Sequence, residues 1–78
     1  MDLQIEDVGA RAGKQAADVC QAKTREGDPI RRSLFEKVQA ARAEAQKLKD
    51  SASEDDRAVA IYWQSFSDEF NSAFGGTH

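Results

Sequence analysis

The clearest structural signal in this 78-residue sequence is Glu26-Gly27-Asp28-Pro29. Gly27 can adopt the left-handed conformation that often follows the last residue of a helix. Asp28 is a typical N-cap residue, and Pro29 suits the first helical position, where its missing N–H is not needed. The tetrapeptide therefore predicts that one helix ends and another begins at this point.

The stretch before this turn predicts a first helix over residues 3–25. Its apolar positions recur every three or four residues, as one face of a helix requires, and are Ile5, Val8, Ala12, Ala16 and Val19, followed by the stem of Lys23. Glycine inside a helix costs about 1 kcal/mol relative to alanine. We therefore expect another helix backbone to approach the smooth strip formed by Gly9, Gly13, Ala16 and Ala17. The alternative is that residues 1–13 are frayed.

The stretch after the turn predicts a second helix over residues 29–50 and a third over residues 54–74, with a tail at 75–78. The second helix carries a coiled-coil-like seam of mostly small residues, namely Leu34, Val38, Ala41, Ala45, Leu48 and Ala52. The boundary is indicated by Ser51-Ala52-Ser53-Glu54, which we interpret as a capping box followed by acids in a first helical turn. Because residues 31–73 contain neither glycine nor proline, one continuous helix from 29 to 74 is the alternative.

These patterns predict an all-α fold, an up-down-up three-helix bundle, with a helical hairpin that has one long second helix as the alternative. Thirteen of the 31 hydrophobic residues are alanines, which contribute little when buried. A chain this short has a marginal core unless something supplements it. We therefore expect the chain to associate with itself, as a homodimer, or with another protein.

Enzymatic chemistry is not indicated, and we expect neither a cofactor nor a metal. The only histidine is His78, in a glycine-rich tail, whereas a catalytic base must be held in place by its surroundings. Cys20 lies on or beside an apolar helical face and is interpreted as a structural thiol. The acids Glu54, Asp55 and Asp56 point about 100° apart on a helix, so they are better explained as helix-start residues than as ligands of one ion.

The candidate partner-binding residues form an aromatic stripe near the end of the chain. Tyr62 flanks the stripe, and its members at helical spacing are Trp63, Phe66, Phe70 and Phe74. Aromatic residues of this kind are favoured at protein interfaces. The same residues are also what the core of a three-helix bundle needs, so both interpretations stay open.

Charge suggests two further hypotheses. The net charge of −3 argues against general binding to nucleic acid or anionic membranes. Arg31 and Arg32 at the start of the second helix could nevertheless contact DNA or RNA. The third segment is acidic, so it could instead imitate nucleic acid and block a nucleic-acid-binding protein; its candidate contacts are Asp55, Asp56, Asp68 and Glu69.

The function that these features favour is a small, non-enzymatic adaptor or regulator that binds a protein through its helices. The sequence contains no apolar run of the roughly 20 residues that a membrane span needs, and it shows no signal peptide. A single cysteine suits a reducing compartment. We therefore expect a soluble cytoplasmic protein.

Overall fold

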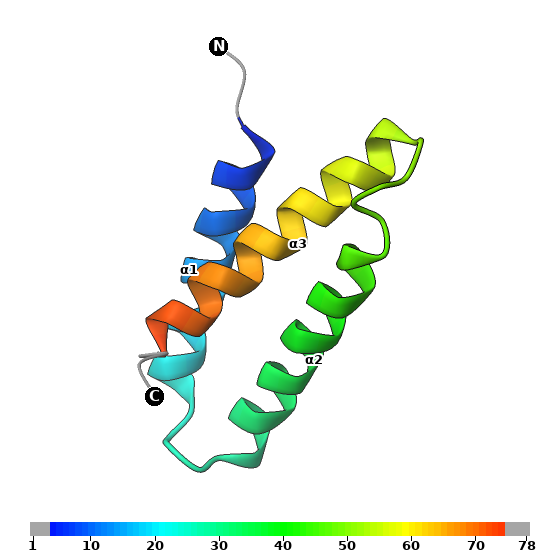
Figure 1. Cartoon of the computed structure of the whole chain (residues 1–78). Helices are drawn as coiled ribbons and strands as arrows, with labels where there is room; N and C mark the ends of the chain where they lie inside the picture. The colour runs from blue at the N-terminus through cyan, green and yellow to red at the C-terminus, as the bar shows by residue number, and fades with distance from the viewer. Residues whose placement is uncertain (1–3, 75–78) are drawn as a thin grey trace.

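The computed structural model describes residues 4–74. This part of the chain forms three α-helices: α1 (Ile5–Lys23), α2 (Pro29–Gln46) and α3 (Glu54–Ala73). Both α1 and α2 pack against α3, whereas α1 and α2 hardly contact each other (Figure 1). The helices run up, down and up, which confirms the expected three-helix bundle. The predicted helix start at residue 3 and the tail at 75–78, with Gly75 and His78, lie outside the described residues.

The turn between α1 and α2 forms as its residues indicate. Gly27 has a φ of 87°, in the left-handed region. The Asp28 carboxylate accepts a hydrogen bond from the backbone N–H of Ile30 at 2.8 Å, and Pro29 is the first residue of α2. Because Thr24 is extended, α1 ends at Lys23, two residues before the predicted end.

Replacing Asp28 with alanine is expected to lower the free energy of unfolding by about 1 kcal/mol, because an N–H at the start of α2 then loses its acceptor. Urea denaturation followed by circular dichroism measures the difference. Asp28→Asn keeps an acceptor oxygen at the same place and should stay close to the wild type. Equal loss in the two variants would show that the cap bond is not what stabilises this turn.

The break between α2 and α3 differs in detail from the prediction. α2 ends at Gln46, and the N–H groups of Lys47 and Leu48 bond to carbonyls only three residues back, so the chain leaves the helix through tight turns. The predicted end at residue 50 was therefore four residues too late. The capping residue is Ser53, whose hydroxyl accepts from the N–H of Asp56, and not Ser51. This break also excludes the continuous second helix.

The closest helix contact joins α1 to α3 along small residues. A Cβ atom added to Gly9 would lie 3.1 Å from Cα of Tyr62, and one added to Gly13 would lie 2.9 Å from Cα of Phe66; the carbonyl oxygens of the same two residues would be closer still. Side chains of any size are thus excluded where the two backbones meet. Gly9 and Gly13 of the expected strip meet the backbone of α3 as predicted, Ala17 is buried, and Ala16 is half-buried at the edge of the strip.

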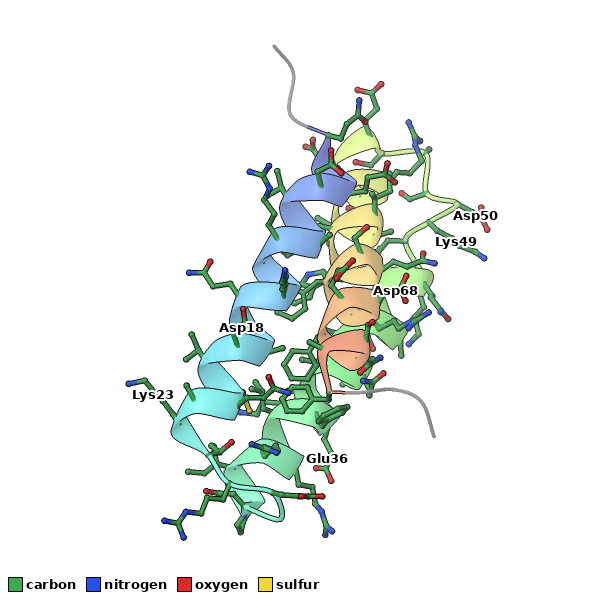
Figure 2. All side chains as sticks on the ribbon, turned by 90° about the vertical axis from the view of Figure 1, so that its left-hand side faces the viewer. Asp18, Lys23, Glu36, Lys49, Asp50 and Asp68 are labelled. Atoms are coloured by element: carbon green, nitrogen blue, oxygen red, sulfur yellow. The ribbon has the colours of Figure 1, made fainter. Side chains whose placement is uncertain are left out.

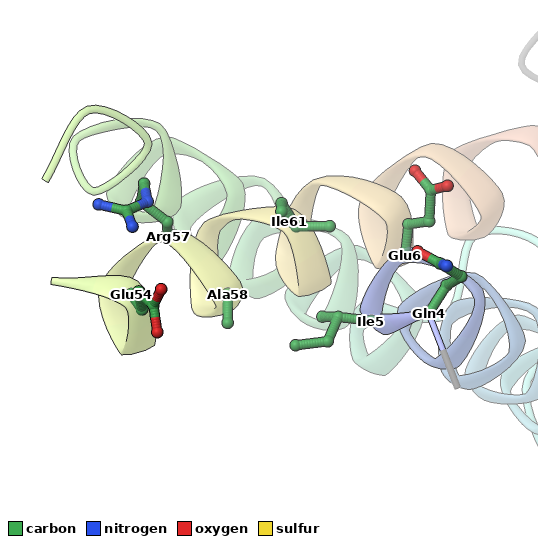
Figure 3. A pocket seen from close by; sticks show the side chains of 7 residues that line it. All are labelled: Gln4, Ile5, Glu6, Glu54, Arg57, Ala58 and Ile61. Carbon is green, nitrogen blue, oxygen red and sulfur yellow. The ribbon is translucent and has the colours of Figure 1, made fainter. Parts of the chain in front are cut away.

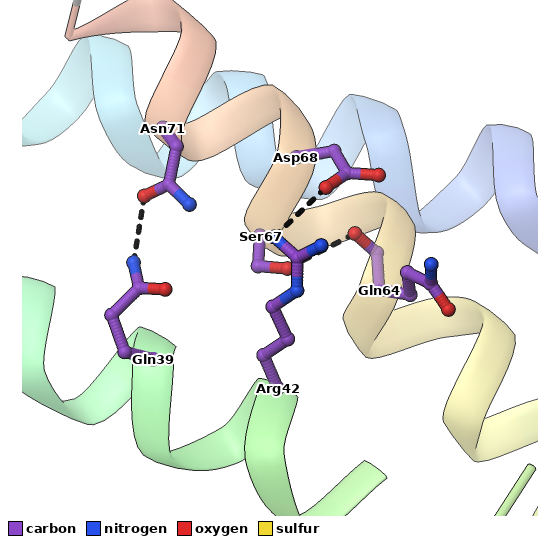
Figure 4. A network of polar contacts seen from close by, with 6 residues as sticks. All are labelled: Gln39, Arg42, Gln64, Ser67, Asp68 and Asn71. Carbon is purple, nitrogen blue, oxygen red and sulfur yellow. Dashed lines mark hydrogen bonds and ion pairs between the residues drawn. The ribbon is translucent and has the colours of Figure 1, made fainter. Parts of the chain in front are cut away.

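The hydrophobic core is small and lies at the junction of the three helices. Its fully or nearly fully buried members are Ala17, Val38 and Phe70, with Leu34, Phe35, Phe66 and Phe74 packed around them. The edges of the α2–α3 contact are polar: Arg42 pairs with Asp68 at 3.0 Å, and Gln39 donates to Asn71 at 2.7 Å (Figure 4). Few large side chains are completely buried, so the stability of the bundle depends on a handful of residues.

Candidate interaction surface

The part of the chain described, residues 4–74, contains no cluster of metal-ligating side chains and no exposed thiol. No group of three or more His, Cys, Asp or Glu side chains in this part of the chain could hold a metal ion. Cys20 is buried, and its sulfur lies 3.5 Å from the hydroxyl of Thr24. None of the helices described is long and apolar enough to cross a lipid bilayer.

A hollow of about 470 Å³ lies between the first turns of α1 and α3 (Figure 3). Glu54 and Arg57 stand at one end and Gln4 and Glu6 at the other. The guanidinium of Arg57 is occupied, since it donates to the carbonyl of Ser51 at 2.7 Å. The ionisable side chains of the hollow are Glu6, Glu54 and Arg57, and both carboxylates are exposed, so no buried acid or base is held there.

The aromatic stripe of α3 lies mainly inside the bundle. Phe70 is 0% exposed, and its ring contacts those of Phe35, Phe66 and Phe74 at centroid distances of 5.0 to 6.2 Å. Phe66 and Phe74 are half-buried against the same core. The structure therefore uses these three rings for packing, and a role in binding a partner stays a prediction for them.

Tyr62 and Trp63 keep part of their surface in solvent. Both are half-buried, and their rings meet edge to face at a centroid distance of 5.2 Å. Trp63 also contacts Phe66 at 5.0 Å, which links the pair to the core. Of the five predicted aromatic contacts, only these two could bind a partner without being withdrawn from the core, because the other three rings pack in it.

Three of the six candidate charged contacts, namely Arg31, Asp56 and Asp68, have partners within the chain. Arg31 donates to the hydroxyl of Thr24 at 3.0 Å and to its carbonyl at 2.8 Å, and its guanidinium lies 5.3 Å from the centre of the Phe74 ring. Asp56 accepts from Ser51 at 2.9 Å. The remaining candidates divide as follows: Asp68 pairs with Arg42, whereas Arg32, Asp55 and Glu69 are exposed.

These contacts give little support to direct nucleic-acid binding by α2. A phosphate-binding helix needs free basic side chains, and Arg31 is committed to the end of α1. Charged groups elsewhere, such as Asp18, Lys23 and Glu36, project away from the bundle as on an ordinary solvated surface (Figure 2). The nucleic-acid hypotheses remain predictions that no contact in the structure favours.

Among residues 4–74, an exposed apolar face lies on α1, beside its contact with α3. Its residues, which we call the α1 track, are Ile5, Val8, Ala12, Ala16 and Val19; Ala12 and Ala16 are half-buried, and Ala16 also packs against the edge of the core. The side chains of Ile5 and Val8 are each 41% exposed, and that of Val19 is 48% exposed. This face lies beside the contact with α3, because each of the last four track residues is followed directly by a buried one, namely Gly9, Gly13, Ala17 and Cys20.

Two apolar grooves adjoin the α1 track, one at each end. At the start of α1, Ile5 and Val8 form a groove of about 330 Å³ with Val59 and Tyr62 of α3. Toward the end of α1, the later track residues form a groove of about 570 Å³ with Ile30 and Leu34 of α2. Ile30 is 66% exposed. The track and its grooves thus make one continuous apolar surface to which all three helices contribute.

The sequence identified the residues of the α1 track as one apolar face of the first helix but did not indicate that this face is exposed. The spacing of the small residues on α1 was the signal that could have indicated this outward orientation. Successive helical residues point about 100° apart, so a helix that packs through Gly9, Gly13 and Ala17 must turn Val8 and Ala12 aside.

Comparison of the chain with models of protein families, with curated proteins and with solved structures gives no match.

Proposed function

We propose that this chain is a non-enzymatic adaptor or regulator that binds a protein through its helices, with the α1 track and its two grooves as the binding surface. The observation that supports this most is the exposure of Val8, Val19 and Ile30 on one continuous face. Contiguous apolar surface rimmed by polar residues is typical of interaction sites in proteins. Cys20 is the one cysteine and suits a reducing compartment, so the proposal places this function in the cytoplasm.

The form of the surface favours a helix as the bound element. An amphipathic helix lies in an apolar groove and anchors itself through residues at i, i+3, i+4 and i+7. The track residues have this spacing themselves, and the two grooves beside them are open to solvent and lined mainly by apolar side chains. Tyr62 borders the first groove, so one of the predicted aromatic contacts belongs to the proposed surface.

The Val19→Glu variant is expected to lose at least nine tenths of the protein captured by the wild-type chain from a native lysate, because an unpaired carboxylate would have to be buried in the interface. Ile61→Glu is the matched control, since Ile61 is 46% exposed but lies on α3 outside the track. Capture should persist in high salt, which screens charge pairs but not apolar contacts. Equal capture by the two folded variants would remove the track from the binding surface.

A further inference from the structure

We propose that the occupant of the α1 track is the α1 track of a second copy of this chain, docked antiparallel about a two-fold axis that passes near Ala12. This inference rests on the proposed function, because it takes the track as a binding surface and names what covers it. A two-fold interface must be self-complementary, since each surface patch meets the same patch of the partner. The spacing, the grooves and the charges of the track all meet this requirement.

The spacing of the track residues reads the same in both directions. The steps from Ile5 to Val8, Ala12, Ala16 and Val19 are three, four, four and three residues. An antiparallel helix centred on Ala12 therefore places Ile5 opposite the partner's Val19, Val8 opposite the partner's Ala16, and Ala12 opposite its own copy. Every apolar residue of the track then meets an apolar residue, and the small side chains at the centre allow the two helices to come close.

In the same arrangement, the groove at one end of the track faces the groove at the other end of the partner's track. The side chains of Ile5 and Val8 in one copy, which line a groove with Val59 of α3, face the groove that Val19 forms with Ile30 of α2 in the other copy. The two-fold axis repeats this contact at the opposite end of the interface. Ile30, the most exposed large hydrophobic residue among residues 4–74, is thereby covered in both copies.

Charges at the two ends of α1 favour the antiparallel direction. The first turn of α1 carries Glu6 and Asp7, and it lies beside the acidic start of α3. The last turn carries Lys23, which lines the groove with Ile30. An antiparallel pair brings the acidic end of one copy toward Lys23 of the other, whereas a parallel pair would place like charges together and align the two helix dipoles.

The size of the surface also points to a pairing that includes the grooves. A standard interface buries about 800 Å² on each partner. The track alone is one helix face about 21 Å long, at 1.5 Å per residue, which is too small for a stable dimer. With the groove walls supplied by α2 and α3, three helices of each copy contribute to the contact.

Sedimentation equilibrium of the purified chain, from micromolar to millimolar concentration, tests this pairing. We expect a reversible dimer whose dissociation constant rises at least tenfold in Val19→Glu, and likewise in Val8→Glu, but stays within about threefold in Ile61→Glu. Circular dichroism shows whether each variant is folded. A wild-type chain that is monomeric over the whole range, or a dimer unaffected by both track variants, would overturn the inference.

Cross-linking tests the direction of the pair. Ala12→Cys should form a covalent dimer with itself on mild oxidation, because its two copies meet near the axis, while the wild type, with its buried Cys20, should not. A mixture of Ile5→Cys and Val19→Cys chains, one carrying a size tag, should give mainly the mixed product with a short thiol cross-linker. Products that each variant forms only with itself would indicate a parallel pair and contradict the proposal.

Sedimentation and lysate capture together distinguish a failure of this pairing from a failure of the proposed function on which it rests. A purified chain that stays monomeric but loses a lysate partner in Val19→Glu leaves the proposed function in place and replaces the second copy with a different protein. A dimer that passes both tests supports the inference without any captured partner. Failure of sedimentation and of capture together would remove the α1 track as a binding surface.

Discussion

Phe70→Ala is expected to leave the chain largely unfolded at room temperature. Phe70 is 0% exposed, and its ring contacts three other phenylalanine rings at the junction of the helices. Truncating a buried phenylalanine costs about 3–5 kcal/mol, through lost burial and the cavity left behind. A single core in a chain of this size rarely supplies more than about 3–5 kcal/mol, so the loss is comparable to the whole stability.

Thermal unfolding followed at 222 nm measures this effect, at one fixed protein concentration so that association does not shift the midpoint. Phe74→Ala should be milder, because Phe74 is half-buried at the end of α3. Ile61→Ala should stay within about 0.5 kcal/mol of the wild type, since its side chain already faces solvent in part. A Phe70→Ala chain that melts within a few degrees of the wild type would mean that the core lies elsewhere.

Much of the fold could be predicted because the residues that end one helix and begin the next act through local conformation and local hydrogen bonds. Gly27, Asp28 and Pro29 determine their own turn through backbone conformation and one side-chain hydrogen bond. The end of α2 was harder to place. Nothing in the residues from 47 to 50 forbids a helix, and the break depends on tight turns and on which serine caps α3.

The binding surface could be predicted only in part, for a different reason. Periodicity shows which residues share a face of a helix but not which neighbour that face meets. The aromatic stripe of α3 was the obvious candidate for a partner, yet the structure uses Phe70 to fill the space left between its alanine-rich neighbours. The exposed apolar surface lies on α1 instead, because α1 packs against α3 through its small residues and leaves its larger apolar residues outside that contact.

Gly13→Ala is the substitution for which packing and helix propensity predict opposite signs. Propensity alone predicts a gain of about 1 kcal/mol, because alanine favours the helix more than glycine does. The added Cβ, however, would lie 2.9 Å from both Cα and the carbonyl carbon of Phe66. These are backbone atoms that no rotamer change can move, so α1 and α3 must separate.

We therefore expect Gly13→Ala to lower the free energy of unfolding by about 2 kcal/mol, since overpacking costs typically 1–3 kcal/mol and the propensity gain offsets only part of a larger strain. The double variant with Gly9→Ala should not fold, because Gly9 meets the backbone of Tyr62 in the same way. Lys14→Ala is the control on α1: its side chain is exposed, and the change should be within about 0.5 kcal/mol. Urea denaturation gives the sign directly. A Gly13→Ala chain more stable than the wild type would show that the two helices do not meet backbone to backbone. The outward orientation of the α1 track follows from that contact, so it would then be contradicted as well.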